Sequence, residues 1–154
     1  MKKGEEPERE RGRASAAEEA VFVELLRTSD VLTRGVVQVL KKGNLSPTQY
    51  NVLRILRGAR QGLTCGEIAG RLITRDPDIT RLLDRMEKRG LISRSRESRD
   101  RRVVLTRIAA EGLRLLSRLD GPVQKAHRSQ LGHLGPKRLR ELSELLQAAR
   151  EGGE

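Results

Sequence analysis

Arginine and lysine are the residues of this sequence whose distribution points most directly to a chemical task. The 154 residues include 32 Lys or Arg and 21 Asp or Glu, which gives a net charge of +11 at pH 7. Residues 71–107 hold 12 basic and 6 acidic side chains, so this segment carries +6 of the excess. Such a concentrated positive segment is the electrostatic footprint of an element that neutralises nucleic-acid phosphates.

The scarcity of aromatic residues indicates which kind of nucleic acid the chain can bind. The chain has one Phe, one Tyr and no Trp, which is too few rings to stack the bases of a single strand. Reading a duplex through its grooves needs a helix and cations but no stacking platform. Composition and charge together favour double-stranded DNA as the partner.

Residues 77–89 have the pattern of an amphipathic helix with a charged outer face. Apolar side chains recur at i, i+3, i+4 and i+7 from Ile79 to Met86, which predicts one buried stripe. Arg81 lies on the opposite face, where a guanidinium can donate two hydrogen bonds to a guanine in the major groove. From this helix and the turn before it we expect DNA contacts through Thr74, Arg75, Asp78, Thr80, Arg81, Arg85 and Lys88.

A second basic element follows directly. The runs 91–94 and 103–108 are rich in β-prone residues, and an arginine-rich polar stretch separates them. This pattern predicts a β-hairpin with a charged tip, which is suited to a neighbouring minor groove. The side chains expected to contact DNA from the hairpin are Arg96, Arg99 and Arg101.

Short capped helices are the elements that must position these cations. The run Ser46–Gln49 predicts a helix start with a capping box and a proline at the first helical position. Thr64 and Glu67 form a second capping box. Asp76 is expected to cap the third helix, with Pro77 as its first residue. Three helices followed by a basic hairpin predict a mainly α fold with a small β-hairpin wing, a winged helix-turn-helix.

The flanking segments predict an assembly of two chains. We expect a disordered tail at residues 1–15, an N-terminal dimerisation helix at 16–44, a winged helix-turn-helix DNA-binding domain at 45–109, and C-terminal dimerisation helices at 110–150. Gly121-Pro122 should kink or interrupt the first of those last helices. The small central unit cannot bury the apolar stripes of the terminal helices, whereas a homodimer would. The alternative is that both stripes pack within one subunit.

The central motif resembles a known family. The run Asp78–Ile92, followed by Arg94 and then by Asp100-Arg101-Arg102, is similar to the MarR (multiple antibiotic resistance regulator) family of bacterial transcription factors. The resemblance implies a homodimer on a pseudo-palindromic duplex, acting as a repressor that a small-molecule effector releases. It also implies that Asp100 and Arg102 stabilise the wing. The chain departs from the family where a capping Thr is usual, because Ala109 occupies that position.

Two other interpretations stay open. Cys65 is the only cysteine and lies at a predicted helix start, where some thiols become reactive, so the alternative to effector release is a redox-responsive regulator. A winged helix can also bind protein, but it would then need apolar side chains on the outer face of the third helix, where this chain has charged ones.

Several classes of function are expected to be absent. The sequence has no glycine-rich phosphate loop, no Ser-His-Asp order and no paired carboxylates in an apolar setting, so we expect no enzyme and no cofactor. His127 and His133 are six residues apart and do not share a helix face, so no metal site is expected. Without an apolar run of 18 residues or a signal peptide, the expected partners exclude a membrane and the expected location is the cytoplasm.

Overall fold

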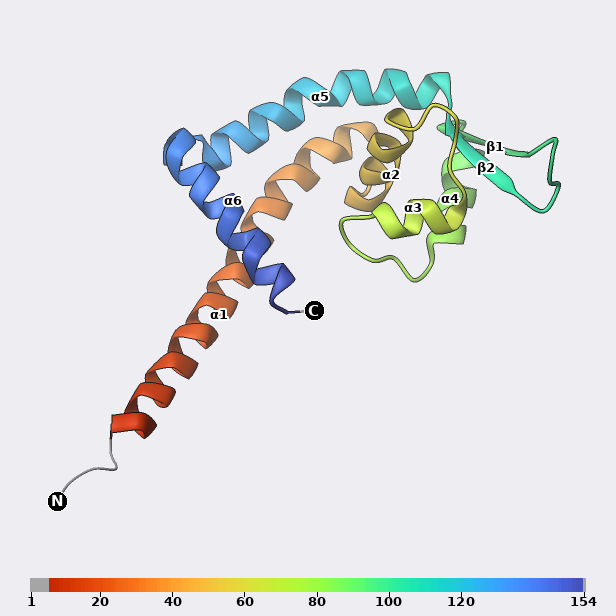
Figure 1. Ribbon diagram of the computed structural model, residues 1–154. Helices are drawn as coiled ribbons and strands as arrows, with labels where there is room; N and C mark the ends of the chain where they lie inside the picture. The colour runs from red at the N-terminus through yellow and green to blue at the C-terminus, as the bar shows by residue number, and fades with distance from the viewer. Residues whose placement is uncertain (1–5, 154) are drawn as a thin grey trace. The chain divides into compact units, whose positions relative to one another are not determined.

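The computed structural model describes the backbone of residues 6–153 and the side chains of residues 16–153. Within that range the chain is mainly helical and carries one antiparallel β-hairpin (Figure 1). The elements are α1 (Glu6–Leu40), α2 (Pro47–Arg57), α3 (Cys65–Arg71), α4 (Ile79–Lys88), β1 (Ile92–Arg96), β2 (Val104–Ile108), α5 (Ala110–Leu131) and α6 (Gly135–Glu151). The predicted fold class, helical with a small hairpin wing, is confirmed.

The N-terminal helix is longer than the sequence predicts. The chain forms two compact units, residues 1–35 and 36–154, and α1 runs through the boundary. Its backbone is helical from Glu6, whereas the apolar period predicts a start at Ala16. The earlier residues are rich in Glu and Arg, which favour helices without any apolar period. The expected disordered tail is therefore wrong from Glu6 onward, and its first five residues lie outside the described part of the chain.

Both predicted capping boxes are present. The Ser46 hydroxyl accepts a hydrogen bond from the Gln49 N–H at 3.1 Å, and the Gln49 side chain accepts one from the Ser46 N–H at 3.0 Å. Thr64 and Glu67 make the same reciprocal pair at the start of α3. Hydrogen bonds from Thr64 lower the pKa of the Glu67 carboxyl. These caps fix where α2 and α3 begin, and so where the chain turns toward α4.

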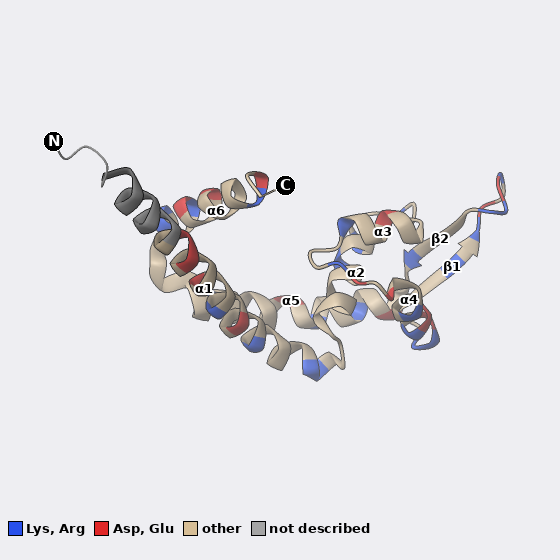
Figure 2. Cartoon of the chain, turned by 90° about the horizontal axis from the view of Figure 1, so that it is seen from below, with Lys and Arg blue, Asp and Glu red and all other residues tan. Residues whose placement is uncertain are grey.

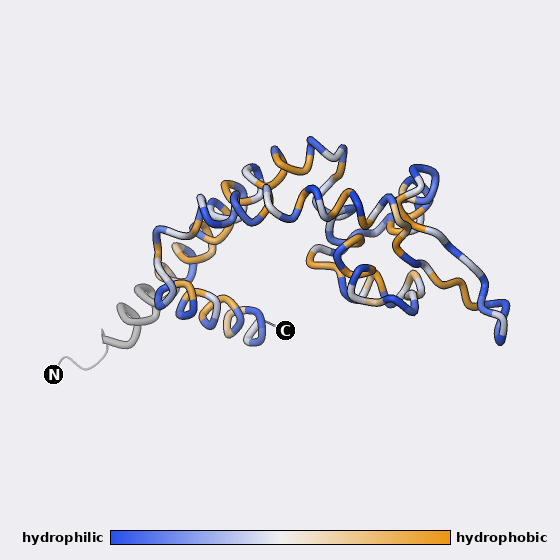
Figure 3. Tube along the Cα trace, turned by 90° about the horizontal axis from the view of Figure 1, so that it is seen from above, coloured by the Kyte–Doolittle hydropathy of each residue, from blue (hydrophilic) through white to orange (hydrophobic). Residues whose placement is uncertain are grey.

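The core of the unit 36–154 is aliphatic. It begins with Leu40, the last residue of α1, and continues through the inward faces of α2, α4 and α5. Its completely buried residues are Leu40, Val52, Leu53, Leu56, Ile68, Met86 and Leu116. By contrast, α6 buries none of its residues, although hydrophobic residues recur along it, as Figure 3 shows for the helix that ends at the C-terminus. The apolar face of α6 is thus left uncovered within this chain.

The third predicted helix begins two residues later than expected. The Asp76 carboxylate accepts a hydrogen bond from the Asp78 N–H at 2.8 Å, as a capping side chain would. The residues Pro77 and Asp78 form a turn, however, and α4 starts at Ile79. Asp78 has φ −115° and ψ 32°, which is not helical. The prediction that Asp76 caps this helix is therefore wrong, because the N-cap of α4 is Asp78 and has no side-chain cap. The Asp76 carboxylate instead closes the turn that precedes the helix.

The hairpin pairs β1 with β2 in an antiparallel register, with Ile92 opposite Ile108 and Arg96 opposite Val104. Leu63 adds an isolated bridge beside β2, because its N–H and C=O exchange hydrogen bonds with Thr106 at 3.0 and 2.7 Å. The bridge ties the segment between α2 and α3 to the base of the hairpin.

The predicted interruption at Gly121-Pro122 does not occur, since α5 continues through Pro122 to Leu131. Pro122 lacks the N–H of one helical hydrogen bond, but Leu119 and Val123 on either side are 4% and 2% exposed. Their burial holds the helix together across the proline. Asp120 also accepts two hydrogen bonds from Arg57 of α2, at 2.7 and 3.2 Å, which raises the pKa of that guanidinium.

Replacing Ala109 with serine should stabilise the protein by about 1 kcal/mol. Ala109 is the N-cap of α5, with the extended backbone of a capping residue and no side-chain cap. A serine hydroxyl there can accept a hydrogen bond from a first-turn N–H that now lacks a side-chain partner. The midpoint of urea unfolding measures the gain at constant m-value. A midpoint no higher than that of the wild type would contradict this account of the cap.

Candidate nucleic-acid interface

A hydrogen bond from another helix holds the turn before α4 in place. The Ile73 N–H donates a hydrogen bond to the Asn51 side-chain oxygen of α2 at 2.8 Å. Thr74 and Arg75 follow directly and are both exposed. The turn that carries these two predicted contact residues is therefore held at one end by α2 and at the other by the Asp76–Asp78 hydrogen bond.

The buried residues of α4 lie on its inner face and pack in the core, which leaves polar residues on the outer face. Leu82, Leu83 and Met86 are at most 4% exposed and pack in the core. The predicted contact residues on the rest of the helix and just before it are all exposed: Asp78, Thr80, Arg81, Arg85 and Lys88. In Figure 2, basic residues gather on α4 and on the hairpin. The helix thus presents cations and hydrogen-bond donors on the side that faces away from the core.

Arg81 is well exposed on this outer face. Its side chain is 78% exposed, and its guanidinium lies 3.7 Å from the Asp78 carboxylate. That distance is too long for a hydrogen bond, and an exposed pair of this kind contributes little free energy. Arg81 can therefore turn toward a base edge without losing a strong partner.

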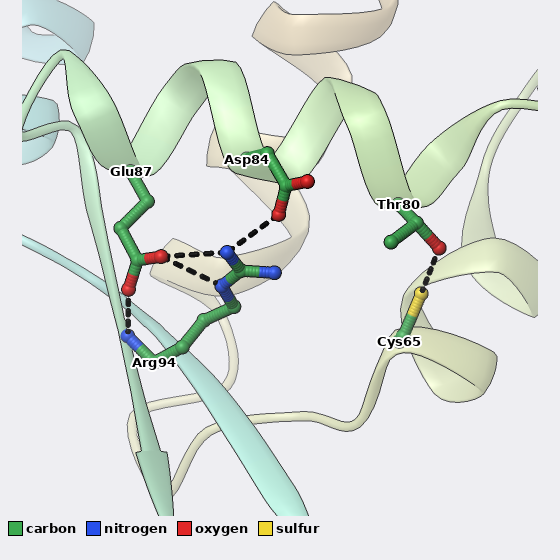
Figure 4. A network of polar contacts seen from close by, with 5 residues as sticks. All are labelled: Cys65, Thr80, Asp84, Glu87 and Arg94. Carbon is green, nitrogen blue, oxygen red and sulfur yellow. Dashed lines mark hydrogen bonds and ion pairs between the residues drawn. The ribbon is translucent and has the colours of Figure 1, made fainter.

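Thr80 lies next to the only cysteine. Its hydroxyl oxygen is 4.0 Å from the Cys65 sulfur (Figure 4). Cys65 is partly exposed. The contact joins the start of α3 to the first turn of α4, which are the two helices of the helix-turn-helix.

A charged network joins α4 to the hairpin (Figure 4). The Arg94 guanidinium on β1 donates to the Glu87 carboxylate at 2.6 and 2.9 Å and to the Asp84 carboxylate at 2.6 Å. The Arg94 backbone N–H also donates to Glu87 at 3.0 Å. On a helical wheel Asp84 falls on the outer face with Arg81, but in the structure its carboxylate turns to the hairpin.

The electrostatics of the network follow from its hydrogen bonds. The bonds from Arg94 lower the pKa of the Glu87 carboxyl, and Glu87 in turn raises the pKa of Arg94. Arg94 is the least exposed of the three side chains, at 25%. The network is therefore a charge-assisted brace between the recognition helix and the wing.

Sequence reasoning assigned no role to Arg94, although a signal was present. Glu87 precedes Gly90 by three residues and Arg94 follows it by four. Gly90 has φ +70° and turns the chain from α4 into β1. Because such a turn reverses the chain, opposite charges on its two sides come close together in space. The spacing of Glu87 and Arg94 could therefore have predicted the pair.

The tip of the wing is held mainly by Asp100. Its carboxylate accepts a hydrogen bond from the Arg102 N–H at 3.0 Å, while the Arg102 guanidinium is 4.0 Å away and its side chain is 96% exposed. The Arg96 guanidinium donates to the Arg101 carbonyl at 2.8 Å, so Arg96 braces the hairpin as well. Arg99 and Arg101 are exposed at the tip.

Two other kinds of site are absent from the part of the chain that the structure describes. No group of three or more His, Cys, Asp or Glu side chains among them could hold a metal ion. No described helix is both long enough and apolar enough to cross a membrane.

Comparison with known proteins identifies the fold. One similar structure is the crystal structure of a MarR family transcriptional regulator from Streptomyces coelicolor in complex with DNA. The two chains superpose with a TM-score of 0.79 and are 24% identical, over 89% of this chain and 88% of that chain. The homoprotocatechuate degradative operon repressor of Escherichia coli is 24% identical over 129 residues, 84% of this chain and 86% of that protein.

A more similar sequence establishes the relationship. The crystal structure of a MarR transcription factor from Planctomyces limnophilus is 40% identical, with a TM-score of 0.67, over 84% of this chain and 95% of that one. The sequence model of the MarR family matches residues 45–104, the segment from the end of the α1–α2 connection to the start of β2. These similarities agree with the helix-turn-helix and the wing described above. The chain therefore belongs to the MarR family of DNA-binding transcription regulators.

Proposed function

We propose that this regulator is a homodimeric repressor that binds a pseudo-palindromic operator and is released by a small-molecule effector. The observation that carries the proposal is the free, outward-facing cationic surface of α4 beside a braced, arginine-tipped wing. A helix of this kind fits the major groove, and a basic hairpin fits the adjacent minor groove. The Escherichia coli relative is named an operon repressor, which supports repression over activation as the role of this regulator.

The side chains divide into three roles in this proposal. Asp78, Thr80 and Arg81 lie at the N-terminal end of α4 and read base edges, because that end enters a groove most deeply in helix-turn-helix proteins. Asp100 and Arg102 maintain the wing, through the hydrogen bond that the Arg102 backbone N–H donates to the Asp100 carboxylate. Phosphate and groove contacts come from Thr74, Arg75, Arg85, Lys88, Arg96, Arg99 and Arg101.

Uncovered apolar surface supports the homodimer. On α1, Phe22 is 61% exposed and Val21 59%, and on α6 Leu145 is 69% exposed. Soluble monomers rarely leave regular apolar helix faces open to water. A two-fold dimer covers the same patch on both chains and places two recognition helices on successive half-sites.

A cavity of about 460 Å³ supports effector release. It lies against α2, and its lining is mostly apolar but includes Tyr50, Arg54 and His127. The Arg54 guanidinium sits 5.9 Å from the centre of the Tyr50 ring. Asn51 and Ile73, whose hydrogen bond fixes the turn before α4, also line the cavity. An effector bound there would press on the turn that positions the recognition helix.

The test is a titration of the full chain against duplex DNA taken from the promoter region of its own gene. Fluorescence anisotropy over a range of salt concentrations gives affinity and stoichiometry together. The proposal expects salt-sensitive binding with two chains per site. Absence of salt-sensitive duplex binding would reject it and favour a protein-binding winged helix.

Substituting Arg81 with alanine should cost about 1–3 kcal/mol at one base position of the operator. The cause is the loss of a bidentate contact between the guanidinium and a guanine. Binding to a panel of single-base operator variants measures the effect, and Arg138→Ala on exposed α6 is a matched control. If Arg81→Ala discriminated among the variants as the wild type does, Arg81 would not read a base.

A further inference from the structure

A second cationic surface lies beside the far end of the recognition helix. A cavity of about 420 Å³ is lined by Lys41, Arg85 and Arg89, together with Ser46 and Gln49 of the first turn of α2. The lining contains no acidic residue. Among the described residues, no carboxylate forms an ion pair with Lys41, Arg85 or Arg89. Three positive charges thus converge on one hollow without a counter-charge.

Arg89 builds this surface. Its guanidinium donates to the carbonyl oxygens of Asn44 and Gly43 at 2.6 and 3.2 Å. Asn44 adopts a left-handed backbone, with φ 51°, so the chain turns sharply between α1 and α2. The two hydrogen bonds tie that turn to the end of α4 and bring Lys41 to the same hollow as Arg85.

The position of the hollow along α4 says which phosphates it can reach. Arg81, Arg85 and Arg89 are spaced four residues apart, so each is about 6 Å further along the helix axis. The major groove is only about 12 Å wide. If Arg81 reaches a base edge, Arg85 and Arg89 lie at the rim of the groove, where the sugar-phosphate backbone runs.

We infer that Lys41, Arg85 and Arg89 form a binding site for one backbone phosphate of duplex DNA, at the end of the recognition helix away from its base-reading residues. The inference rests on the proposed placement of α4 in the major groove. It adds to the interface a residue, Lys41, from outside the helix-turn-helix and the wing. The recognition helix is then held to the DNA backbone at its C-terminal end as well as through the hairpin.

The test measures how duplex binding depends on salt. The full chain and the variants Lys41→Ala, Arg85→Ala and the double variant are titrated against one duplex at several salt concentrations. Each single variant should lower the slope of log K against log salt, but by no more than about 0.9, the value for one phosphate contact. The double variant should also lose no more than about 0.9, because both cations serve the same phosphate. Lys41→Arg should restore the wild-type slope.

Lys137→Ala is the matched control, since Lys137 is an exposed cation on α6 with an 85% exposed side chain. It should keep the wild-type slope. A Lys41→Ala slope equal to that of a salt-sensitive wild type would overturn the inference, and so would a double variant that loses about 1.8, the value for two separate phosphates. A wild type without salt-sensitive binding would instead overturn the proposed function, so the two failures are distinguishable.

Discussion

Substitution of Arg94 by alanine is expected to weaken operator binding about 100-fold, which is close to 3 kcal/mol. Arg94 makes three side-chain hydrogen bonds to Glu87 and Asp84, at 2.6 to 2.9 Å. Removing it releases the hairpin from α4, so the two DNA-contacting elements no longer hold a fixed spacing. It also leaves the Glu87 and Asp84 carboxylates without their cationic partner on the side that the proposal places against DNA, and negative charges there repel the phosphates.

The hydrogen bonds from Arg94 also bear on the charge of Glu87. They lower the pKa of the Glu87 carboxyl and so favour its charged form in the folded protein. Arg94→Ala removes the cation that balances this carboxylate beside the helix proposed to enter the major groove.

The measurement for Arg94→Ala is anisotropy titration with the operator duplex, alongside circular dichroism and urea unfolding. The matched control is Arg114→Ala, which removes an exposed arginine paired with Glu111 three residues away on α5. A triple variant that adds Asp84→Asn and Glu87→Gln to Arg94→Ala should recover part of the lost affinity, because it removes the two negative charges that repel the DNA phosphates. If Arg94→Ala bound the operator as tightly as Arg114→Ala, the network would have no part in DNA binding.

Local sequence signals predicted the starts of the elements well. The Ser46–Gln49 and Thr64–Glu67 boxes involve residues three apart, so their hydrogen bonds are decided within one helical turn. The apolar period of α4 likewise predicted which of its faces is buried. At Asp76 the same local signals misplaced the helix start, because the Asp76 carboxylate closes a turn and the helix begins only at Ile79.

Features that depend on distant residues could not be predicted in this way. The continuation of α5 through Pro122 depends on the burial of Leu119 and Val123 against other helices. The phosphate site depends on Arg89 reaching the carbonyls of Gly43 and Asn44, which are more than forty residues earlier. Propensity and spacing carry no information about such contacts, because only the packed core decides them.

Gly112 is such a position, and its replacement by alanine is expected to destabilise the protein by about 3 kcal/mol, at the upper end of overpacking costs. Gly112 is buried in the first turn of α5. A Cβ added there would clash with the Leu91 carbonyl oxygen and press on Ile108 and Leu53. The Leu91 oxygen cannot move freely, because it accepts the hydrogen bond of the Ala109 N–H at 3.0 Å. The helix and the hairpin base would have to separate.

Gly70→Ala is the matched control for this substitution. Gly70 lies within α3, is exposed, and has no neighbour within 4 Å of an added Cβ. Since alanine favours a helix over glycine by about 1 kcal/mol, Gly70→Ala should raise the midpoint of urea unfolding while Gly112→Ala lowers it. Equal midpoints for the two variants would show that the approach of α5 to Leu91 is loose. Opposite shifts would show that the fold requires glycine at 112 for close packing, since helix propensity alone favours alanine at both positions.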